Sequence, residues 1–251
     1  IMKNKNNIFI FDIDGTLTEP RKVINNFHYG VFLNFIIENE VYLVTGSDYK
    51  KAKEQLDDFI LDNVSGVFTC MANALHIKGK EVYNNKIEYD KELIHALKNI
   101  RKNSKYPYDK FNNFIEKRSG MINFSVLGRE ADHENRKKYN KWDKKNKERE
   151  IIVKSLSNHY SNYEFVIGGE ISIDIIKKTK DKSQCLDWLN IVPETLCSFD
   201  IPFRNVVFFG DKTKKGGNDY SISKKIKSNG GISYNVSGPQ ETFKIIYEKY
   251  I

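Results

Sequence analysis

The chain has 251 residues, of which 39% are hydrophobic and 13% aromatic, enough for a buried core in one large domain or two modest ones. Lysine and arginine total 41 against 33 acidic residues, a formal net charge of +8. This excess permits phosphorylated or nucleic-acid partners without selecting either. No stretch approaches the ~18–20 uninterrupted apolar residues that a membrane-spanning helix requires, so we expect no membrane partner.

The three cysteines, Cys70, Cys185 and Cys197, are odd in number and show no CxxC spacing. Reduced thiols in a cytosolic chain are the simplest interpretation of this pattern. Two lysines precede the first apolar run, but Asp12 and Asp14 interrupt that run, which is unlike a signal peptide. We therefore expect a cytoplasmic protein.

The first part of the chain alternates strand and helix patterns. A β-branched and aromatic run over 8–12 predicts a buried parallel strand, and Gly79 separates two short strand-like runs typical of a hairpin. Ser47 or Asp48 is placed to cap one of the helices. The other predicted elements are a helix over 27–38, a strand over 41–45, a helix over 50–61 and a strand over 66–71. Such alternation predicts a parallel α/β sheet.

The pattern changes near Asn84. Asp90 is placed to cap a helix over 91–102, whose apolar residues share one face. The following predicted elements are strands over 114–118 and 121–127, a long charged helix over 132–159, and strands over 165–168 and 171–176. This β-rich, antiparallel block predicts a separate α+β domain, residues 85–180, inserted into a core formed by residues 1–84 and 181–251.

The α/β rhythm returns after the inserted block. A helix is predicted over 181–190, and buried strands over 206–210 and 232–236. Pro239 stands at a favoured first position for the last helix, 240–250.

The sharpest chemical signal is the segment FDIDGTLT, which carries Asp12 and Asp14 at the end of the first strand. A solvated turn needs only one Asp, whereas two carboxylates in this context are far more specific. The carboxyl end of a parallel sheet is also where α/β proteins bind their ligands. The segment therefore predicts an active site.

Further groups follow other predicted strands and helices. Thr45 and Ser47 offer hydroxyls beside a helix N-terminus, which suits a phosphate. Lys182 stands at a predicted helix start, and Asp211 follows the second buried strand. A glycine-rich turn with the sequence GGND adds another carboxylate, that of Asp219.

Oxygen ligands at these positions suit a hard cation. Asp12, Asp211 and the backbone of Asp14 are candidate ligands for Mg²⁺. The sequence therefore predicts a magnesium site shared between the ends of two strands.

The segments FDIDGTLT, the hydroxyl pair, Lys182 and GDK…GGND resemble, in order, the four motifs of the haloacid dehalogenase phosphotransferases. The resemblance implies a Rossmann-like parallel-sheet core with an inserted α+β cap domain. It also implies that Asp12 is the nucleophile and Asp14 the acid/base, with Lys182 screening the packed carboxylates.

Further segments, GSDYKKAKEQL, RSGMINFSVLGRE, IGGEISIDI and SYNVSGPQET, resemble the eukaryotic-type phosphomannomutases, and the match runs from Phe9 to about Ile246. That family resemblance implies a mutase that uses Mg²⁺ and a hexose 1,6-bisphosphate as activator and intermediate. It also implies a hexose phosphate substrate and a homodimer joined through the cap.

The same resemblance assigns substrate contacts. Arg21 resembles the core-domain substrate arginine of the family. Three arginines keep the family's spacing of eleven and seven residues and resemble its cap arginines: Arg118, Arg129 and Arg136. Ser172 and Asp174 resemble its cap phosphate and sugar contacts. The planar fork of arginine suits a distal phosphate better than lysine does.

The chain departs from the family at three positions. Asn73-Ala74 stands where the family has Asn-Gly, and Thr45 stands where it has Gly, as in related sugar phosphatases. Lys225 stands where the family's second, structural cation site uses an Asp, which predicts that this second site is lost or changed.

Two enzyme hypotheses follow. The first is a mutase that interconverts mannose 6-phosphate and mannose 1-phosphate through an aspartyl-phosphate and supplies GDP-mannose synthesis. The second is a Mg²⁺-dependent sugar-phosphate phosphatase on the same fold. A nucleic-acid-binding protein is disfavoured because no basic patch interleaved with aromatic residues is found. The choice between mannose and glucose phosphates stays open, since both present the same two phosphates.

Overall fold

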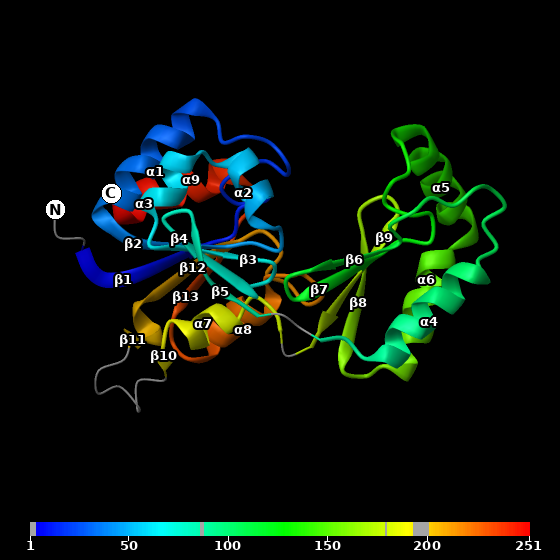
Figure 1. Ribbon diagram of the computed structural model, residues 1–251. Helices are drawn as coiled ribbons and strands as arrows, with labels where there is room; N and C mark the ends of the chain where they lie inside the picture. The colour runs from blue at the N-terminus through cyan, green and yellow to red at the C-terminus, as the bar shows by residue number, and fades with distance from the viewer. Residues whose placement is uncertain (1–3, 86–87, 179, 193–200) are drawn as a thin grey trace. The chain divides into compact units, whose positions relative to one another are not determined.

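The computed structural model describes residues 4–85, 88–178, 180–192 and 201–251. The chain forms two compact units (Figure 1), which we name the core unit, Ile1–Asn85 with Lys180–Ile251, and the cap unit, Lys86–Thr179. No helix within these described ranges is long and apolar enough to cross a membrane. Cys70 and Cys185 are buried, and Cys197 lies outside the described residues.

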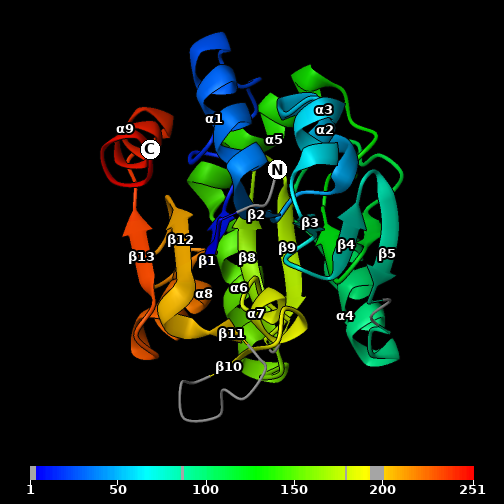
Figure 2. The same cartoon turned by 90° about the vertical axis from the view of Figure 1, so that its left-hand side faces the viewer.

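A seven-stranded sheet forms the centre of the core unit. Its strands are β1 (Asn4–Phe11), β2 (Asn39–Val44), β3 (Gly66–Thr69), β4 (Ala74–Ile77), β5 (Lys80–Asn84), β12 (Val206–Gly210) and β13 (Ile232–Asn235). They lie in the order β13-β12-β1-β2-β3-β4-β5 (Figure 2). The first five strands in this order are parallel, and β4 and β5 form the antiparallel hairpin predicted around Gly79. The parallel strand ends therefore meet at one edge, as a ligand site in this fold class requires.

Helices cover both faces of this sheet. They are α1 (Asn26–Glu38), α2 (Tyr49–Gln55), α3 (Asp58–Asn63), α7 (Gln184–Trp188), α8 (Tyr220–Ser228) and α9 (Pro239–Tyr250). Alternate residues of β1 serve the two faces: Phe9 and Phe11 pack with α1, α3 and α9, whereas Ile8 and Ile10 pack with α7 and α8. Burial on both faces explains why the parallel strands are almost continuously apolar.

Two short segments complete the core unit. Strands β10 (Ile191–Val192) and β11 (Ile201–Pro202) pair in parallel, and a 3-10 turn follows at Phe203–Asn205. The sequence patterns did not indicate this small pair, because two residues carry too little periodicity to predict a strand.

The helix predicted over 50–61 is wrong as a single element, because it is divided between α2 and α3. Leu56 adopts an extended conformation between them. Asp48 caps α2 by accepting the Lys51 N–H, and Asp57 caps α3 by accepting the Ile60 N–H. A side chain that satisfies exposed backbone N–H groups stabilises a new helix start. Asp48, rather than Ser47, is thus the cap.

The cap unit contains a four-stranded antiparallel sheet. Its strands are β6 (Ile115–Arg118), β7 (Met121–Phe124), β8 (Tyr163–Gly168) and β9 (Ser172–Lys177), in the order β6-β7-β9-β8. One face packs on α4 (Lys91–Lys102), α5 (His133–Asn146) and α6 (Glu148–His159) through residues such as Ile122, Phe124 and Ile173. Because strand side chains alternate, the intervening residues occupy the other face.

The helix predicted over 132–159 is also wrong as a single element. Lys147 takes a left-handed conformation, with φ of 55°, between α5 and α6. Next to it, the carboxylate of Asp143 accepts the Arg149 side-chain Nε–H at 2.7 Å and its backbone N–H at 2.9 Å, and both residues are buried. This buried pair stabilises the break, and it depends on tertiary packing that the charge pattern does not reveal.

Asp90 stands at the N-cap of α4, as predicted, but its side chain makes no capping bond. Its carboxylate instead accepts the Tyr163 hydroxyl at 3.0 Å.

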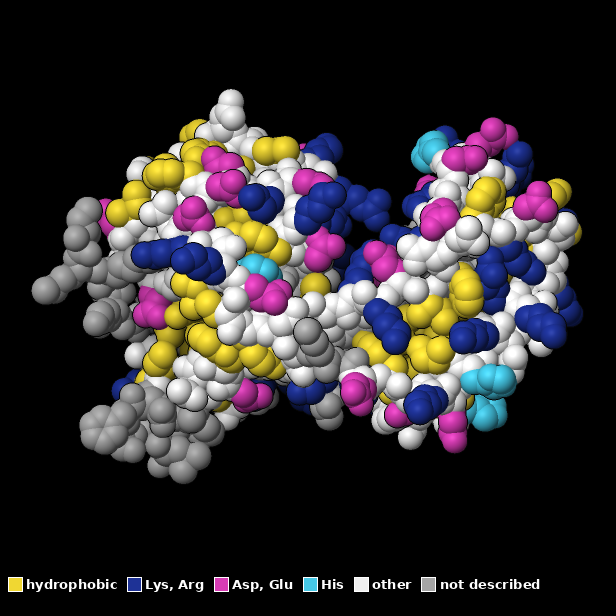
Figure 3. All heavy atoms as spheres, viewed as in Figure 1, with side chains coloured by type: hydrophobic (Ala, Val, Ile, Leu, Met, Phe, Trp, Pro, Cys, Tyr) yellow, Lys and Arg dark blue, Asp and Glu magenta, His cyan; other side chains and the backbone are white. Residues whose placement is uncertain are grey.

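On the face shown in Figure 3, Lys and Arg side chains occur on both units with Asp and Glu side chains among them.

Candidate active site

The turn after β1 projects two carboxylates from the edge of the core sheet. The Asp12 N–H donates to the carbonyl of Phe209 at 2.9 Å, which extends the pairing of β1 with β12. The carbonyl of Ile13 accepts N–H groups from residues 16–18, which closes a tight turn. Gly15 has φ of +81°, and a Cβ there would lie 2.5 Å from Oδ2 of Asp211. Glycine at this position therefore lets the Asp211 carboxylate approach.

Three carboxylates and one lysine form a largely buried cluster at this edge. One oxygen from each of Asp12, Asp211 and Asp219 lies within 4.8 Å of the others, and no second such acidic, His or Cys group occurs in the described part of the chain. Lys182 Nζ lies 2.6 Å from Oδ1 of Asp12 and 2.6 Å from Oδ1 of Asp219. Lys182 and Asp219 are completely buried.

This cluster holds more negative than positive charge. Burial raises the pKa of Asp12 to about 7; Lys182 opposes the rise, and Asp219 and Asp211 add to it. Burial also raises the pKa of Asp211. Burial disfavours the charge on Lys182, but Asp12 and Asp219 outweigh that effect and raise its pKa. One buried ammonium group thus contacts Asp12 and Asp219, and Asp211 has the more exposed Lys212 beside it at 3.9 Å.

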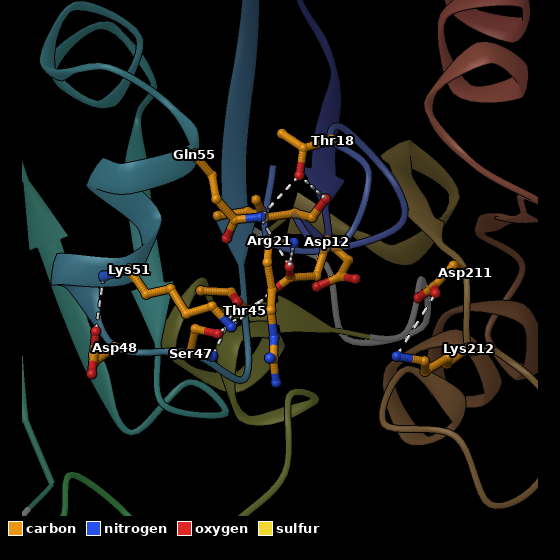
Figure 4. Close-up of polar contacts among 12 residues, drawn as sticks. Asp12, Thr18, Arg21, Thr45, Ser47, Asp48, Lys51, Gln55, Asp211 and Lys212 are labelled. Carbon is orange, nitrogen blue, oxygen red and sulfur yellow. Dashed lines mark hydrogen bonds and ion pairs between the residues drawn. The ribbon is translucent and has the colours of Figure 1, made fainter. Parts of the chain in front are cut away.

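The donor set fits a divalent cation. Among the residues that the structure describes, the buried Oδ1 of Asp211 has no hydrogen-bond partner, and Lys212 Nζ lies 3.9 Å from its Oδ2 (Figure 4). Clustered carboxylate oxygens are the ligands that Mg²⁺ prefers. Asp12, Asp211 and Asp219 are the side chains that would hold it. Asp219 was not among the predicted ligands, although its glycine-rich turn was noted.

The Asp14 carboxylate lies outside that cluster and has its own partners. Its Oδ1 accepts the Arg21 N–H and the Gln55 Nε2–H, both at 2.9 Å. Its Oδ2 lies 3.5 Å from the Ser47 hydroxyl and 3.8 Å from Lys51 Nζ. Burial works against ionisation, but these hydrogen bonds and the Lys51 charge outweigh it and lower the pKa of Asp14. Like the other predicted metal contacts, a contribution of the Asp14 backbone to a metal site stays a prediction.

Three predicted phosphate and substrate contacts, Thr45, Ser47 and Arg21, lie near this second carboxylate. Thr45 is buried after β2, and its Oγ1 accepts the Ser47 N–H at 3.1 Å. Arg21 has φ of 64° and donates its backbone N–H to Asp14, while its exposed side chain extends away from Asp12 (Figure 4). The structure thus places all three residues beside the turn after β1.

Gln55 is a polar residue that sequence reasoning missed. It is 2% exposed, and its Nε2 donates to both Asp14 and Thr18. Lys51 and Gln55 are four residues apart in α2 and therefore lie on one helix face. That spacing in GSDYKKAKEQL was the available signal.

The structure brings the three predicted cap arginines together. Glu116 Oε2 lies 2.8 Å from Nη2 of Arg118 and 3.2 Å from Nε of Arg129. Arg136 donates from Nη2 to the carbonyl of Arg129 at 2.6 Å and from Nε to the carbonyl of Ala131 at 2.9 Å. Arg136 therefore holds the loop that carries Arg129.

The predicted sugar contact lies on the same sheet. Asn123 Nδ2 donates to Oδ1 of Asp174 at 2.6 Å. A Cβ at Gly168 would lie 2.6 Å from Oδ2 of Asp174, so only glycine leaves room for this carboxylate. The Ser172 hydroxyl donates to the carbonyl of Gly168 at 2.8 Å. Burial raises the pKa of Asp174, although Asn123 and two arginines oppose it. Asn123 and Glu116 were not predicted as site residues.

A family model described as eukaryotic phosphomannomutase matches residues 31–251. The chain belongs to this family of enzymes. It is 34% identical over 249 residues to the phosphomannomutase of Solanum lycopersicum, covering 94% of this chain and 91% of the relative. It is 32% identical over 251 residues to phosphomannomutase 2 of Dictyostelium discoideum, covering 97% and 96%. The predicted family resemblance is confirmed.

Solved structures agree with the fold of this phosphomannomutase family member. The C-terminal domain of trehalose-6-phosphate phosphatase from C. albicans superimposes with a TM-score of 0.57 at 17% identity, covering 95% of this chain and 90% of that one. A haloacid dehalogenase-like hydrolase from Bacteroides thetaiotaomicron gives a TM-score of 0.57 at 14% identity, covering 96% and 99%. At these identities the likeness shows the haloacid dehalogenase fold alone, as predicted.

At one of the noted departures from the phosphomannomutase family, the structure gives the side chain a partner. Lys225 lies in α8, and its Nζ is 2.6 Å from Oδ1 of Asp187. An ammonium group paired in this way is not a cation ligand. The loss of a second cation site stays a prediction.

Proposed function

We propose that the chain interconverts mannose 6-phosphate and mannose 1-phosphate by phosphoryl transfer at Asp12, with a hexose 1,6-bisphosphate as intermediate. Membership of the phosphomannomutase family supports this reaction. The observation that carries the mechanism is the separation of two carboxylates: Asp12 belongs to the lysine-containing cluster, whereas Asp14 is held by Gln55 and a backbone N–H. Neighbouring carboxylates with different surroundings suit different roles.

Asp12 is the nucleophile in this proposal. Lys182 holds Oδ1 of Asp12, so Oδ2 is the oxygen that attacks phosphorus. The new Asp12–phosphorus bond forms as the bond from phosphorus to the sugar oxygen breaks. A divalent cation held by Asp12, Asp211 and Asp219 would supply charge neutralisation for the transferring group. Lys182 screens the same carboxylates and fixes the orientation of Asp12.

Asp14 moves the proton in both directions. Its lowered pKa keeps it ionised at rest, so it can accept the proton of a sugar hydroxyl as that oxygen attacks the phosphorylated Asp12. The products of this half-reaction are the bisphosphate, free Asp12 and protonated Asp14. In the second half-reaction Asp14 returns the proton to the sugar oxygen that leaves as the other phosphate transfers to Asp12.

The cap residues bind the phosphate that is not reacting. Arg118, Arg129 and Arg136 carry positive charge for the distal phosphate, and Ser172 adds a hydroxyl. Since the bisphosphate must present either end to Asp12, these three arginines have to bind it in both orientations. Asp174 is proposed to accept a sugar hydroxyl.

Cap closure must also exclude water from the phosphorylated Asp12. Where water enters, the same residues hydrolyse the sugar phosphate instead. Thr45 favours this second candidate function, because a hydroxyl residue stands there in related sugar phosphatases.

The deciding experiment uses the purified full chain with mannose 1-phosphate, Mg²⁺ and a trace of glucose 1,6-bisphosphate. Mannose 6-phosphate and free phosphate are followed in the same tube, with Asp12→Asn as the control. A large excess of mannose 6-phosphate is the expected outcome. Mostly free phosphate would replace the mutase proposal by the phosphatase.

The proposal has two wider consequences. Mannose 1-phosphate formed by the enzyme would supply GDP-mannose synthesis in the cytoplasm. We also propose a homodimer joined through the cap unit, which light scattering of the purified chain tests. A monomer at micromolar concentration would contradict it.

A further inference from the structure

Glu116 is the acidic residue at the centre of the cap arginines. A single oxygen, Oε2, contacts both Arg118 Nη2 at 2.8 Å and Arg129 Nε at 3.2 Å. The three side chains are similarly accessible, with exposed fractions of 33% for Glu116, 27% for Arg118 and 24% for Arg129. The carboxylate therefore links two guanidinium groups at a partly solvated surface.

Strand register fixes the position of Glu116. Glu116 and Arg118 are two residues apart on β6, so their side chains share a face of the sheet. Directly across the sheet, Glu116 pairs with Asn123 on β7, and Asn123 pairs with Asp174 on β9. A one-residue slip would turn all of these groups to the packed face. The backbone therefore places Glu116 on the same face of the sheet as Arg118, Asn123 and Asp174.

The contacts leave most arginine donors available. Arg118 donates one N–H of Nη2 to Glu116, and Arg129 Nε forms an ion pair with the same carboxylate oxygen. A guanidinium carries five N–H donors, so each keeps several for an anion. Within the described part of the chain, Arg118 donates this one side-chain hydrogen bond, and the Arg129 side chain donates none. Both are thus held at one point with the rest of the fork free.

Arg118 and Arg129 are like charges that contact one carboxylate oxygen, and Glu116 offsets their repulsion. Burial lowers the pKa of Arg129, the charges of Arg118 and Arg136 add to this effect, and Glu116 opposes it. Without the carboxylate, repulsion separates the guanidinium groups, and each long side chain regains rotational freedom that binding must remove again.

We propose that Glu116 is a positioning residue that holds Arg118 and Arg129 in the geometry that receives the distal phosphate of the substrate. The inference rests on the proposed function, since it assigns a phosphate to this surface. Glu116 acts through the arginines and touches no reacting atom. Its loss therefore weakens substrate binding and leaves the chemical step at Asp12 unchanged.

The kinetic test compares Glu116→Gln with Glu164→Gln in the full chain. Glutamine keeps the shape of Glu116 and removes its charge. Glu164 lies exposed on β8 of the same sheet, so its replacement removes an equal charge without touching the arginines. For Glu116→Gln we expect KM for mannose 1-phosphate to rise about tenfold, with kcat within about twofold of wild type. Calorimetry should show about tenfold weaker binding of glucose 1,6-bisphosphate, and Glu164→Gln should match wild type.

A second measurement needs no variant and no turnover. The Nε–H signal of Arg129 in the ligand-free wild-type chain should report a rigid side chain by ¹⁵N relaxation. In Glu116→Gln the same signal should become mobile. A side chain that merely stabilised the fold would change the unfolding midpoint without this local loosening.

The two proposals fail in different ways. A wild-type chain that neither binds glucose 1,6-bisphosphate nor converts mannose 1-phosphate overturns the proposed function. Normal wild-type turnover with unchanged KM in Glu116→Gln overturns the role of Glu116 alone. Tighter substrate binding by Glu116→Gln also overturns it, because Glu116 would then compete with the phosphate. A mobile Arg129 side chain in the wild type would also overturn the role of Glu116, even if the variant does not fold.

Discussion

The acidic cluster of the core unit and the arginines of the cap unit differ in their access to water. In the core unit, the side chains of Lys182 and Asp219 are fully buried and that of Asp12 is 4% exposed. In the cap unit, Arg129 and Glu116 remain 24% and 33% exposed. Charges in a desolvated site interact strongly, whereas exposed ion pairs contribute little to stability. Changes in the core cluster should therefore abolish the chemistry or destabilise the fold, and changes in the cap should mainly affect binding.

The largest expected effect is that of Asp12→Asn. The variant keeps the volume of the side chain and loses the carboxylate that attacks phosphorus. Turnover of mannose 1-phosphate should fall by roughly four orders of magnitude. Circular dichroism should report an intact fold, because Lys182 still contacts Asp219. Substantial residual mutase activity would contradict the assignment of Asp12 as nucleophile.

Lys182→Met should have the next largest effect, on stability. The variant leaves Asp12 and Asp219 buried without their ammonium partner, which costs about 3–5 kcal/mol of unfolding free energy. Urea unfolding of the full chain measures this loss. Mg²⁺ should restore part of it, because a cation neutralises the same carboxylates. If Lys182→Met were as stable as the wild type without Mg²⁺, Lys182 would not be the main counter-charge of Asp12 and Asp219.

Arg136→Ala tests the cap side of the comparison. It removes one positive charge and the two hydrogen bonds that Arg136 donates to the carbonyls of Arg129 and Ala131. The ratio kcat/KM for hexose phosphates should fall about 100-fold, with the unfolding free energy changed by less than about 1 kcal/mol. Lys137→Ala, an exposed change on the same helix, is the control. Kinetics equal to wild type would show that Arg136 does not help to bind the distal phosphate.

The sequence was most informative where local pattern and tertiary structure coincide. The apolar runs of β1 and β12 predict neighbouring parallel strands, and parallel strand ends place Asp12 and Asp211 at one edge. The comparisons confirm the family and fold that these motifs indicated. The specific roles of the site residues stay predictions.

Contacts that depend on packing were not visible in the sequence. Glu116 reaches Arg118 along its own strand, but its contact with Arg129 depends on how the following loop returns to the sheet. Asn123 meets Asp174 only through the register of β7 and β9. The break at Lys147 likewise follows from the buried pair of Asp143 with Arg149. Such pairings need the register and the fold, which residue spacing alone does not specify.

The smallest expected effect concerns Asp174, the most deeply buried acid of the cap site. Burial raises its pKa above the value of about 3.9 for an unfolded chain, so the folded state binds the proton more tightly. The ionised carboxylate therefore costs stability above its folded pKa, and the cost disappears as pH falls toward 3.9. Asp174→Asn should be more stable than wild type at pH 7, by on the order of 1 kcal/mol or less.

Urea unfolding at pH 7 and at pH 4 distinguishes this titration from a general effect of the substitution. The advantage of Asp174→Asn should shrink at the lower pH, because the raised pKa makes a larger fraction of wild-type Asp174 protonated and neutral like the amide. Ser172→Ala is the matched control, since it alters a neighbouring buried polar group of β9 that does not titrate in this range. An advantage of equal size at both pH values would show that desolvation of the Asp174 charge is not its cause. The cap site would then differ further from the core cluster, because its ionised Asp174 would not lower the free energy of unfolding.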